Sequence, residues 1–244
     1  FEAVQTNIQG TQNLINAALA ENVESVLAIS TDKASNPTSV MGATKLLSER
    51  LVIAANTYKG HRQTKFGCVR FGNVLGSSGS VVPLFIDQVR EGGPLTVTNP
   101  DMTRFIMSID RAVEFVFQSH AKLEGGEVFI LKMPAFKLED LAVVIRDTFA
   151  PRAGYEPGDI EIDIVGPRPA ERTHEKLVSA DERQQTREAE EMFVLYPEID
   201  LSGYNTMSNI SNTLTEEYTS EDATLLSPDE LSDLIASEAP IGGW

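Results

Sequence analysis

The sequence has little of what several protein classes require. It contains one cysteine, Cys68, which excludes a disulfide framework and a cysteine metal site within one chain. No second histidine follows His174 at the spacing of a zinc site, so we predict no metal. No apolar run is long enough to cross a bilayer, and no secretory leader pattern is present. These absences predict a protein of the reducing cytoplasm, with Cys68 as a small core residue.

Basic residues are also scarce. The chain has 20 lysines and arginines against 36 acidic residues, a net charge of -16, and most of this charge lies after residue 180. Nucleic-acid binding requires a basic patch, and none is evident, so we exclude a nucleic-acid partner. The hydrophobic content of 41% is ordinary for a globular protein.

Apolar runs and helical patterns alternate along the chain. Helices are expected at 3–20, about 40–57, 81–91, 109–120 and 138–149, and strands at 25–31, 64–71, 95–97, 127–132 and 160–165. A further helix is expected to begin at His174-Glu175, and after residue 181 only one more, begun by Ser227. Alternating strands and helices predict an α/β fold with a parallel sheet.

Chemically reactive side chains gather where the strand 25–31 ends. Ser30-Thr31-Asp32-Lys33 presents hydroxyls, a carboxylate and an amine in succession, and Lys45 follows on the next helix, four residues after Met41. Ligands of open α/β sheets bind at this end of the strands, so we expect Asp32, Lys33 and Lys45 to converge. An adjacent acid and base suit removal of a proton from one carbon and of hydroxide from its neighbour. The alternative is a solvated turn with a surface lysine.

A glycine-rich loop at 72–80 leads into the helix that begins at Val81. Backbone amides at such a helix start favour an anion, which predicts a phosphate site; a plain flexible connection is the alternative. Arg104 lies further along and is either a phosphate clamp or a surface arginine. Arg168 flanks a proline turn in the run 166–175.

These motifs together resemble one family. Residues 30–34, Asn36-Pro37-Thr38 and Met41-Gly42-Ala43-Thr44-Lys45 closely resemble the UDP-N-acetylglucosamine 4,6-dehydratases, the polysaccharide-biosynthesis branch of the extended short-chain dehydrogenase/reductases. Asn7 with Gly10-Thr11, and the stretches 69–82, 102–105, 168–175 and 218–220, are similar to the same family. The resemblance covers nearly the whole chain.

The resemblance implies a reaction and an organisation of the chain. NADP (or NAD) takes a hydride from C4 of a UDP-sugar, a proton leaves C5, water is eliminated across C5 and C6, and the hydride returns to C6. Residues 1–135 would be the C-terminal half of the NAD(P)-binding Rossmann domain, with the catalytic residues and interleaved substrate loops. Residues 136–244 would be a small mixed substrate-binding part with an acidic tail.

The resemblance also implies a role for individual residues. Asp32 would be the acid for the C6 hydroxyl, Lys33 the C5 base, and Thr31 a contact of the C4 oxygen. Lys45 would hold the nicotinamide ribose, and the other residues at the cofactor would be Ser30, Asn7 and Arg70. The substrate-binding residues would be Asn73, Val81, Arg104, Arg168 and Glu171, with Asn73, Arg168 and, as a further candidate, Arg104 at the diphosphate.

The chain departs from the family pattern at two places. Met41 stands where the family fold usually has tyrosine, and a thioether cannot deprotonate the C4 hydroxyl. Some members of this branch carry methionine there, so Asp32, Lys33 and water stay open as the C4 base. The glycine-rich turn of the first strand-helix unit is also absent, so we expect an incomplete Rossmann-like parallel sheet. At ~30 residues per βαβ unit, roughly 90 residues would precede Phe1 in an intact member.

The second departure affects activity and partners. We expect the chain by itself to bind NADP weakly and to turn over little substrate. A homo-oligomer is expected, because helices such as 3–20 and 40–57 often pair subunits in this superfamily, and a membrane would be contacted only through upstream segments. The alternative functions are a sugar-nucleotide epimerase or reductase of the same superfamily and a non-catalytic UDP-sugar-binding fragment.

Overall fold

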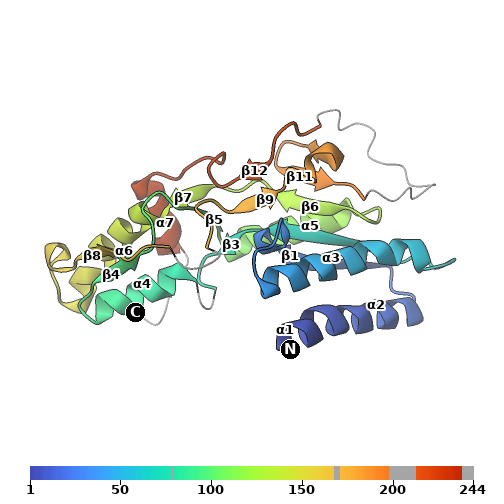
Figure 1. Cartoon of the computed structure of the whole chain (residues 1–244), viewed down its shortest axis with the longest axis horizontal. Helices are drawn as coiled ribbons and strands as arrows, with labels where there is room; N and C mark the ends of the chain where they lie inside the picture. Colours follow the sequence, from blue (N-terminus) through green and yellow to red (C-terminus); the bar gives the residue numbers. More distant parts are fainter. Residues whose placement is uncertain (78–79, 168–170, 198–212, 238–244) are drawn as a thin grey trace. The chain divides into compact units, whose positions relative to one another are not determined.

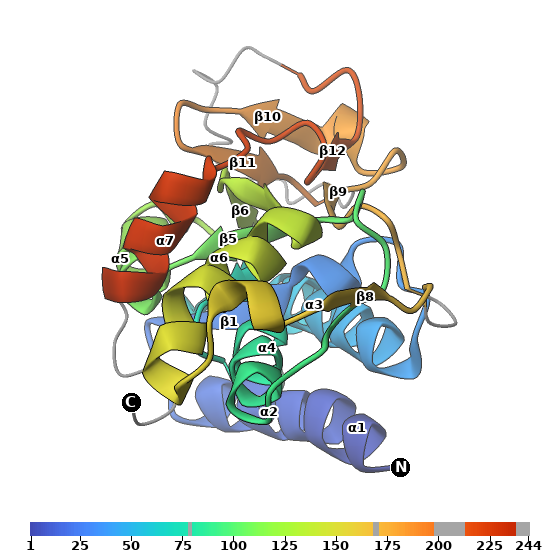
Figure 2. The same ribbon diagram turned by 90° about the vertical axis from the view of Figure 1, so that its left-hand side faces the viewer.

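The computed structural model describes residues 1–77, 80–167, 171–197 and 213–237, which form two compact units (Figures 1 and 2). The first unit takes the described residues within 1–71, 113–132 and 176–219. The second takes those within 72–112, 133–175 and 220–244. The units therefore alternate along the sequence, where we expected substrate-loop segments interleaved within residues 1–135 and a boundary at residue 136.

A five-stranded sheet forms the centre of the first unit. Its order is β1 (Ser25–Thr31), β2 (Lys65–Phe71), β6 (Val128–Leu131), β11 (Met192–Leu195) and β10 (Thr186–Glu188). The first three strands are parallel, and β11 and β10 continue the sheet in antiparallel fashion. All of β6 and every residue of β2 after Lys65 are buried, as expected of parallel strands covered on both faces, and all of these except Arg70 are apolar or glycine. The predicted α/β class and parallel sheet are confirmed.

Two long helical segments accompany this sheet and run side by side in both views (Figures 1 and 2). The first comprises α1 (Glu2–Val4), a π-helical stretch (Gln5–Gly10) and α2 (Thr11–Ala20), and the second is α3 (Val40–Tyr58). The helix α5 (Ile109–Ala121) contains the change from one unit to the other at residue 113, and β12 (Tyr218–Thr219) pairs with β9 (Lys176–Val178). Among the described residues, no helix combines the length and the hydropathy needed to cross a membrane.

The second unit packs three helices with two small sheets. The helices are α4 (Val81–Arg90), α6 (Leu138–Ala153) and α7 (Pro228–Ser237). The strands are β3 (Asn73–Val74), β5 (Thr103–Met107) and β7 (Ala135–Lys137) in one sheet, and β4 (Leu95–Val97) and β8 (Ile162–Ile164) in the other. The helices bury one core, to which Phe85, Leu141 and Leu231 contribute. The predicted capping box of the last helix is confirmed, because Ser227 and Glu230 each accept the other's backbone N–H.

Two expectations after residue 170 are wrong. His174-Glu175 does not begin a helix: these residues lead into the strand β9, and His174 forms a bridge with Thr103. The segment after residue 181 also contains β10 and β11, where we expected one helix only. Both strands have four residues or fewer, and their pairing with the sheet outweighs the acidic sequence around them.

Candidate functional site

The strand β1 ends in a single 3-10 turn, Asp32–Ala34, which carries the predicted acid and base. The Asp32 side chain is 4% exposed and the Lys33 side chain 42%. The Lys33 ammonium lies 3.0 Å from both carboxylate oxygens of Asp32, and the Thr31 hydroxyl donates to one of them at 2.7 Å. The structure therefore joins Thr31, Asp32 and Lys33 in one hydrogen-bonded group at the carboxyl end of a parallel strand.

Glycine at position 42 allows the helix α3 to approach this turn closely. Ser39 caps the helix and accepts the Gly42 N–H at 3.1 Å. A Cβ atom on Gly42 would collide with the carbonyl oxygen of Lys33 and would lie 3.0 Å from Cβ of Pro37. The close contact fixes the start of α3 against the backbone of the turn.

Met41 and Lys45 lie on the first turns of α3. Met41 is exposed and Lys45 half-buried, and within the described part of the chain no hydrogen bond or ion pair involves the Lys45 ammonium. The structure records no bond from Lys45 to the Asp32–Lys33 pair. Asn7 donates to the Thr44 hydroxyl at 3.0 Å, and that hydroxyl donates to the carbonyl of Met41. Asn7 therefore lies beside the α3 turn that carries Met41 and Lys45.

Arg70 has a different environment from the one predicted for a cofactor ligand. It is fully buried, and all five of its N–H donors are directed at Glu49, Glu182 and the carbonyl of Leu177. The Ser30 hydroxyl likewise donates to Glu49, at 2.7 Å. A cofactor contact by Arg70 would require it to break buried ion pairs, so in this structure its role is structural.

In the second unit, three of the predicted substrate-binding residues gather around Glu175. Asn73 donates to both carboxylate oxygens of Glu175 and to the carbonyl of Phe105. Arg104 lies 3.5 Å from Glu171 and 3.6 Å from Glu175. Sequence reasoning did not select Glu175, although it lies in the run that carries the family resemblance.

The other two predicted substrate-binding residues lie apart from this cluster. Val81 begins α4 and is half-buried against the core of the second unit, and Arg168 lies outside the described residues.

Cys68 is fully buried, as predicted, and burial raises the pKa of its thiol well above the ordinary value.

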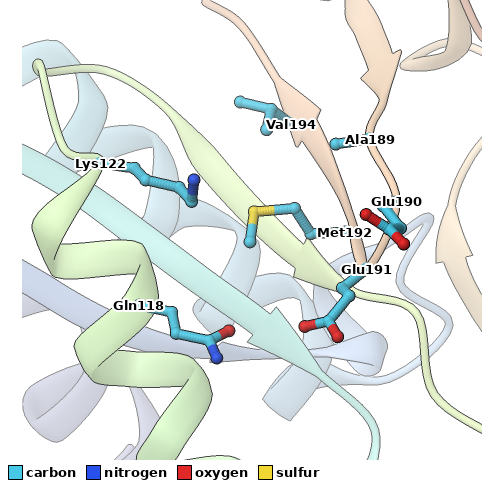
Figure 3. A pocket seen from close by; sticks show the side chains of 7 residues that line it. All are labelled: Gln118, Lys122, Ala189, Glu190, Glu191, Met192 and Val194. Atoms are coloured by element: carbon cyan, nitrogen blue, oxygen red, sulfur yellow. The ribbon is translucent and has the colours of Figure 1, made fainter.

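The first unit also contains a pocket of about 400 Å³ between α5 and β11 (Figure 3). It is lined by Gln118, Lys122, Ala189, Glu190, Glu191, Met192 and Val194. No predicted catalytic or binding residue lines this pocket. Because its lining carries both negative carboxylates and a positive lysine, its charge does not indicate which class of ligand it would bind.

Comparison with known proteins identifies the kind of chain this is. A family model described as "Polysaccharide biosynthesis protein" matches residues 1–197. An uncharacterized membrane protein of Methanocaldococcus jannaschii is 51% identical over 235 residues, which are 96% of this chain and 68% of that protein. A UDP-N-acetylglucosamine 4,6-dehydratase (inverting) of Campylobacter jejuni is 42% identical over 200 residues, which are 82% of this chain and 57% of that enzyme.

Two further comparisons bear on function and on fold. A UDP-glucose 4-epimerase of Rickettsia rickettsii is 34% identical over 238 residues, 96% of this chain and 68% of that protein. The X-ray structure of Pen from Bacillus thuringiensis is 39% identical and superposes with a TM-score of 0.86, over 98% of this chain and 69% of that one. The chain thus spans between 57% and 68% of the length of these curated relatives.

Proposed function

The chain belongs to the polysaccharide biosynthesis protein family, and from this premise we propose that it acts as a nucleotide-sugar 4,6-dehydratase on UDP-N-acetylglucosamine. The observation that carries the proposal is the hydrogen-bonded group of Thr31, Asp32 and Lys33 at the end of β1. The Campylobacter relative, a UDP-N-acetylglucosamine 4,6-dehydratase, gives further support.

Asp32 and Lys33 act as the acid and the base of the elimination. One proton passes from the Lys33 ammonium to the Asp32 carboxylate along their 3.0 Å contact, which leaves a neutral amine and a carboxylic acid. The amine takes the proton from C5, and the acid gives its proton to the departing C6 hydroxyl. Water leaves and the ion pair is restored. A bound sugar that excludes water favours the neutral pair, because burial disfavours charged forms.

A bound nicotinamide dinucleotide, NADP in this proposal, would supply the hydride acceptor for C4 and the hydride donor for C6. The half-buried Lys45 fits its ribose, because a lysine ammonium donates three hydrogen bonds and the described residues satisfy none of them. Thr31 already donates its proton to Asp32, so toward the C4 hydroxyl of the sugar it acts as an acceptor. The C4 base is Asp32, Lys33 or water, since the thioether of Met41 takes no proton.

The second unit binds the UDP diphosphate in this proposal. Arg104 is suited to phosphate because a guanidinium forms paired, charge-assisted hydrogen bonds with it. In the structure Arg104 donates to the carbonyls of Thr103 and Thr173. Its acidic partners are Glu171 and Glu175, so phosphate binding involves an exchange of these carboxylates for phosphate. Asn73, Val81 and Arg168 are the other proposed substrate residues.

An epimerase is the second candidate, favoured by the Rickettsia relative. Two residues argue against an epimerase: Lys33 stands where the superfamily usually has glutamate, and Met41 stands where it usually has tyrosine. A binding module without turnover is the third candidate, and the retained Asp32, Lys33 and Lys45 speak against that.

Proton NMR of UDP-N-acetylglucosamine in D₂O tests the proposal. The assay is run on the 244-residue chain and on any longer form of the protein, with NADP and separately with NAD. From a longer form we expect a new C6 methyl signal with deuterium at C5, which Asp32→Asn should abolish, and from the 244-residue chain little or none. A C4 epimer without a methyl signal would favour the epimerase. UDP binding by calorimetry with no change in the sugar would leave only the binding module.

A further inference from the structure

A buried charge cluster contacts the residues on either side of the segment 31–34, which carries the proposed acid and base and is called the catalytic turn in this subsection. Its centre is Arg70 on β2, which is fully buried. The Arg70 guanidinium lies 2.5 Å from Oε1 of Glu49 on α3 and 2.8 Å from Oε1 of Glu182, and it also donates to the carbonyl of Leu177 on β9 at 2.8 Å. One side chain thus joins a central strand, the helix that carries Lys45, and two segments from the distant C-terminal part of the unit.

The cluster holds the catalytic turn at both ends. Ser30, just before Thr31-Asp32-Lys33, donates from its hydroxyl to Glu49 at 2.7 Å. Ser35, just after the turn, donates from its hydroxyl to Glu182 at 3.4 Å. Both serines are buried. The two carboxylates that accept hydrogen bonds from Arg70 therefore also accept hydrogen bonds from the two serines that flank the acid–base pair.

The electrostatics show that the cluster is tightly coupled. Burial by itself would raise the pKa of Glu182, but the charge and hydrogen bonds of Arg70, together with hydrogen bonds from Ser179, lower the pKa to about 2. Burial would lower the pKa of Arg70, yet the two glutamates hold it above the ordinary value. Apolar side chains of similar volume often stabilise a core as well as buried ion pairs do. Stability alone therefore does not account for this arrangement.

We propose that Arg70, with Glu49 and Glu182, positions the Asp32–Lys33 pair by fixing both ends of its turn against α3 and β9. The inference rests on the proposed function of that pair, and Arg70 itself touches no reacting atom. Directional hydrogen bonds specify where Ser30 and Ser35 lie, which an apolar cluster would not do. Glu49 lies one helical turn after Lys45, so the same contacts also set the rotation of α3 about its axis.

Amide hydrogen exchange tests this proposal without substrate or cofactor. Arg70→Lys keeps the charge but cannot make five fixed hydrogen bonds, and Glu49→Gln keeps the shape but removes a charge. In both variants, residues 31–35 should exchange at least 10-fold faster, beyond any change in global stability. The control is Val194→Ala on β11, a buried truncation that should raise exchange only in proportion to its loss of global stability. If Arg70→Lys does not fold, Glu49→Gln and Ser35→Ala decide the test.

The proposal is overturned if residues 31–35 respond in these variants no more than in Val194→Ala. This readout stands whether or not the chain proves to be a dehydratase. If the NMR assay shows turnover, a second readout follows: kcat should fall at least 10-fold in Glu49→Gln while KM for the UDP-sugar stays within twofold, because the proposed diphosphate contacts in the second unit are untouched. A rise in KM with unchanged kcat would contradict a positioning role.

Discussion

Replacement of Gly42 by alanine gives a direct test of the packing at the turn Asp32–Ala34. An added Cβ would collide with the carbonyl oxygen of Lys33, a backbone atom that no rotamer change can move aside. Overpacking of this kind costs about 3 kcal/mol at the upper end of its usual range. Alanine in place of glycine within a helix returns about 1 kcal/mol. The net expectation is a loss of about 2 kcal/mol, or roughly 4–8 °C in Tm for a chain of this size.

Gly10 supplies the matched control, because it also lies in a helical backbone of the first unit. Its added Cβ would meet only a backbone oxygen at 3.7 Å, an ordinary contact. Gly10→Ala should therefore stabilise the chain by about 0.5–1 kcal/mol. Urea unfolding of both variants, followed by circular dichroism, measures the difference. If Gly42→Ala proves as stable as Gly10→Ala, the close approach of α3 to the turn is refuted.

Three further predictions concern charge, reactivity and assembly. The pKa of Glu182 is lowered from 4.5 to about 2 in the folded chain, so its contribution is fully present above pH ~5 and is lost as the pH falls toward 2. That contribution is about 3 kcal/mol. When the free energy of unfolding is measured against pH over this range, its slope in Glu182→Gln should correspond to the uptake of about one proton fewer than in the unchanged chain. Cys68 is buried with a raised thiol pKa, so an aromatic disulfide reagent should modify it only at the rate of unfolding, and immediate modification of the folded chain would contradict this. Leu47 is 45% exposed on α3, and if α2 and α3 pair subunits, Leu47→Glu should lower the mass measured by light scattering while Phe117→Glu on α5 leaves it unchanged.

The sequence pattern was sufficient for the N-terminal part of the first unit. The strand β1 and the turn after it were predicted because a short apolar run ends abruptly in polar residues, and the structure has the strand at the predicted bounds, Ser25–Thr31. The helix α3 was predicted at about 40–57 from its helical pattern after the Asn36-Pro37 turn, and it ends one residue later, at Tyr58. Long periodic elements like these carry their own signal.

Short strands carry no such signal. The strands β9 and β10 have three residues each, and they exist because they pair with distant segments. The local sequence around β9 is charged, and the local sequence around β10 is rich in glutamate and arginine, so neither predicts a strand. Tertiary pairing decided both, which is why the C-terminal third was predicted poorly while the neighbouring helices were not.

The buried cluster was missed for a different reason, and the sequence did contain a usable signal for it. Arg70 lies in an otherwise apolar strand, where an arginine is almost never fully buried unless it is paired. Its partner must then be an acid on the buried face of a neighbouring element, and Glu49 is such a residue, on a helix whose inward positions include Val52 and Ile53. Resemblance directed attention to the residues that meet a substrate and assigned Arg70 to the cofactor. The requirement that a buried charge be paired would have assigned it to Glu49, and with it to the turn that carries Asp32 and Lys33.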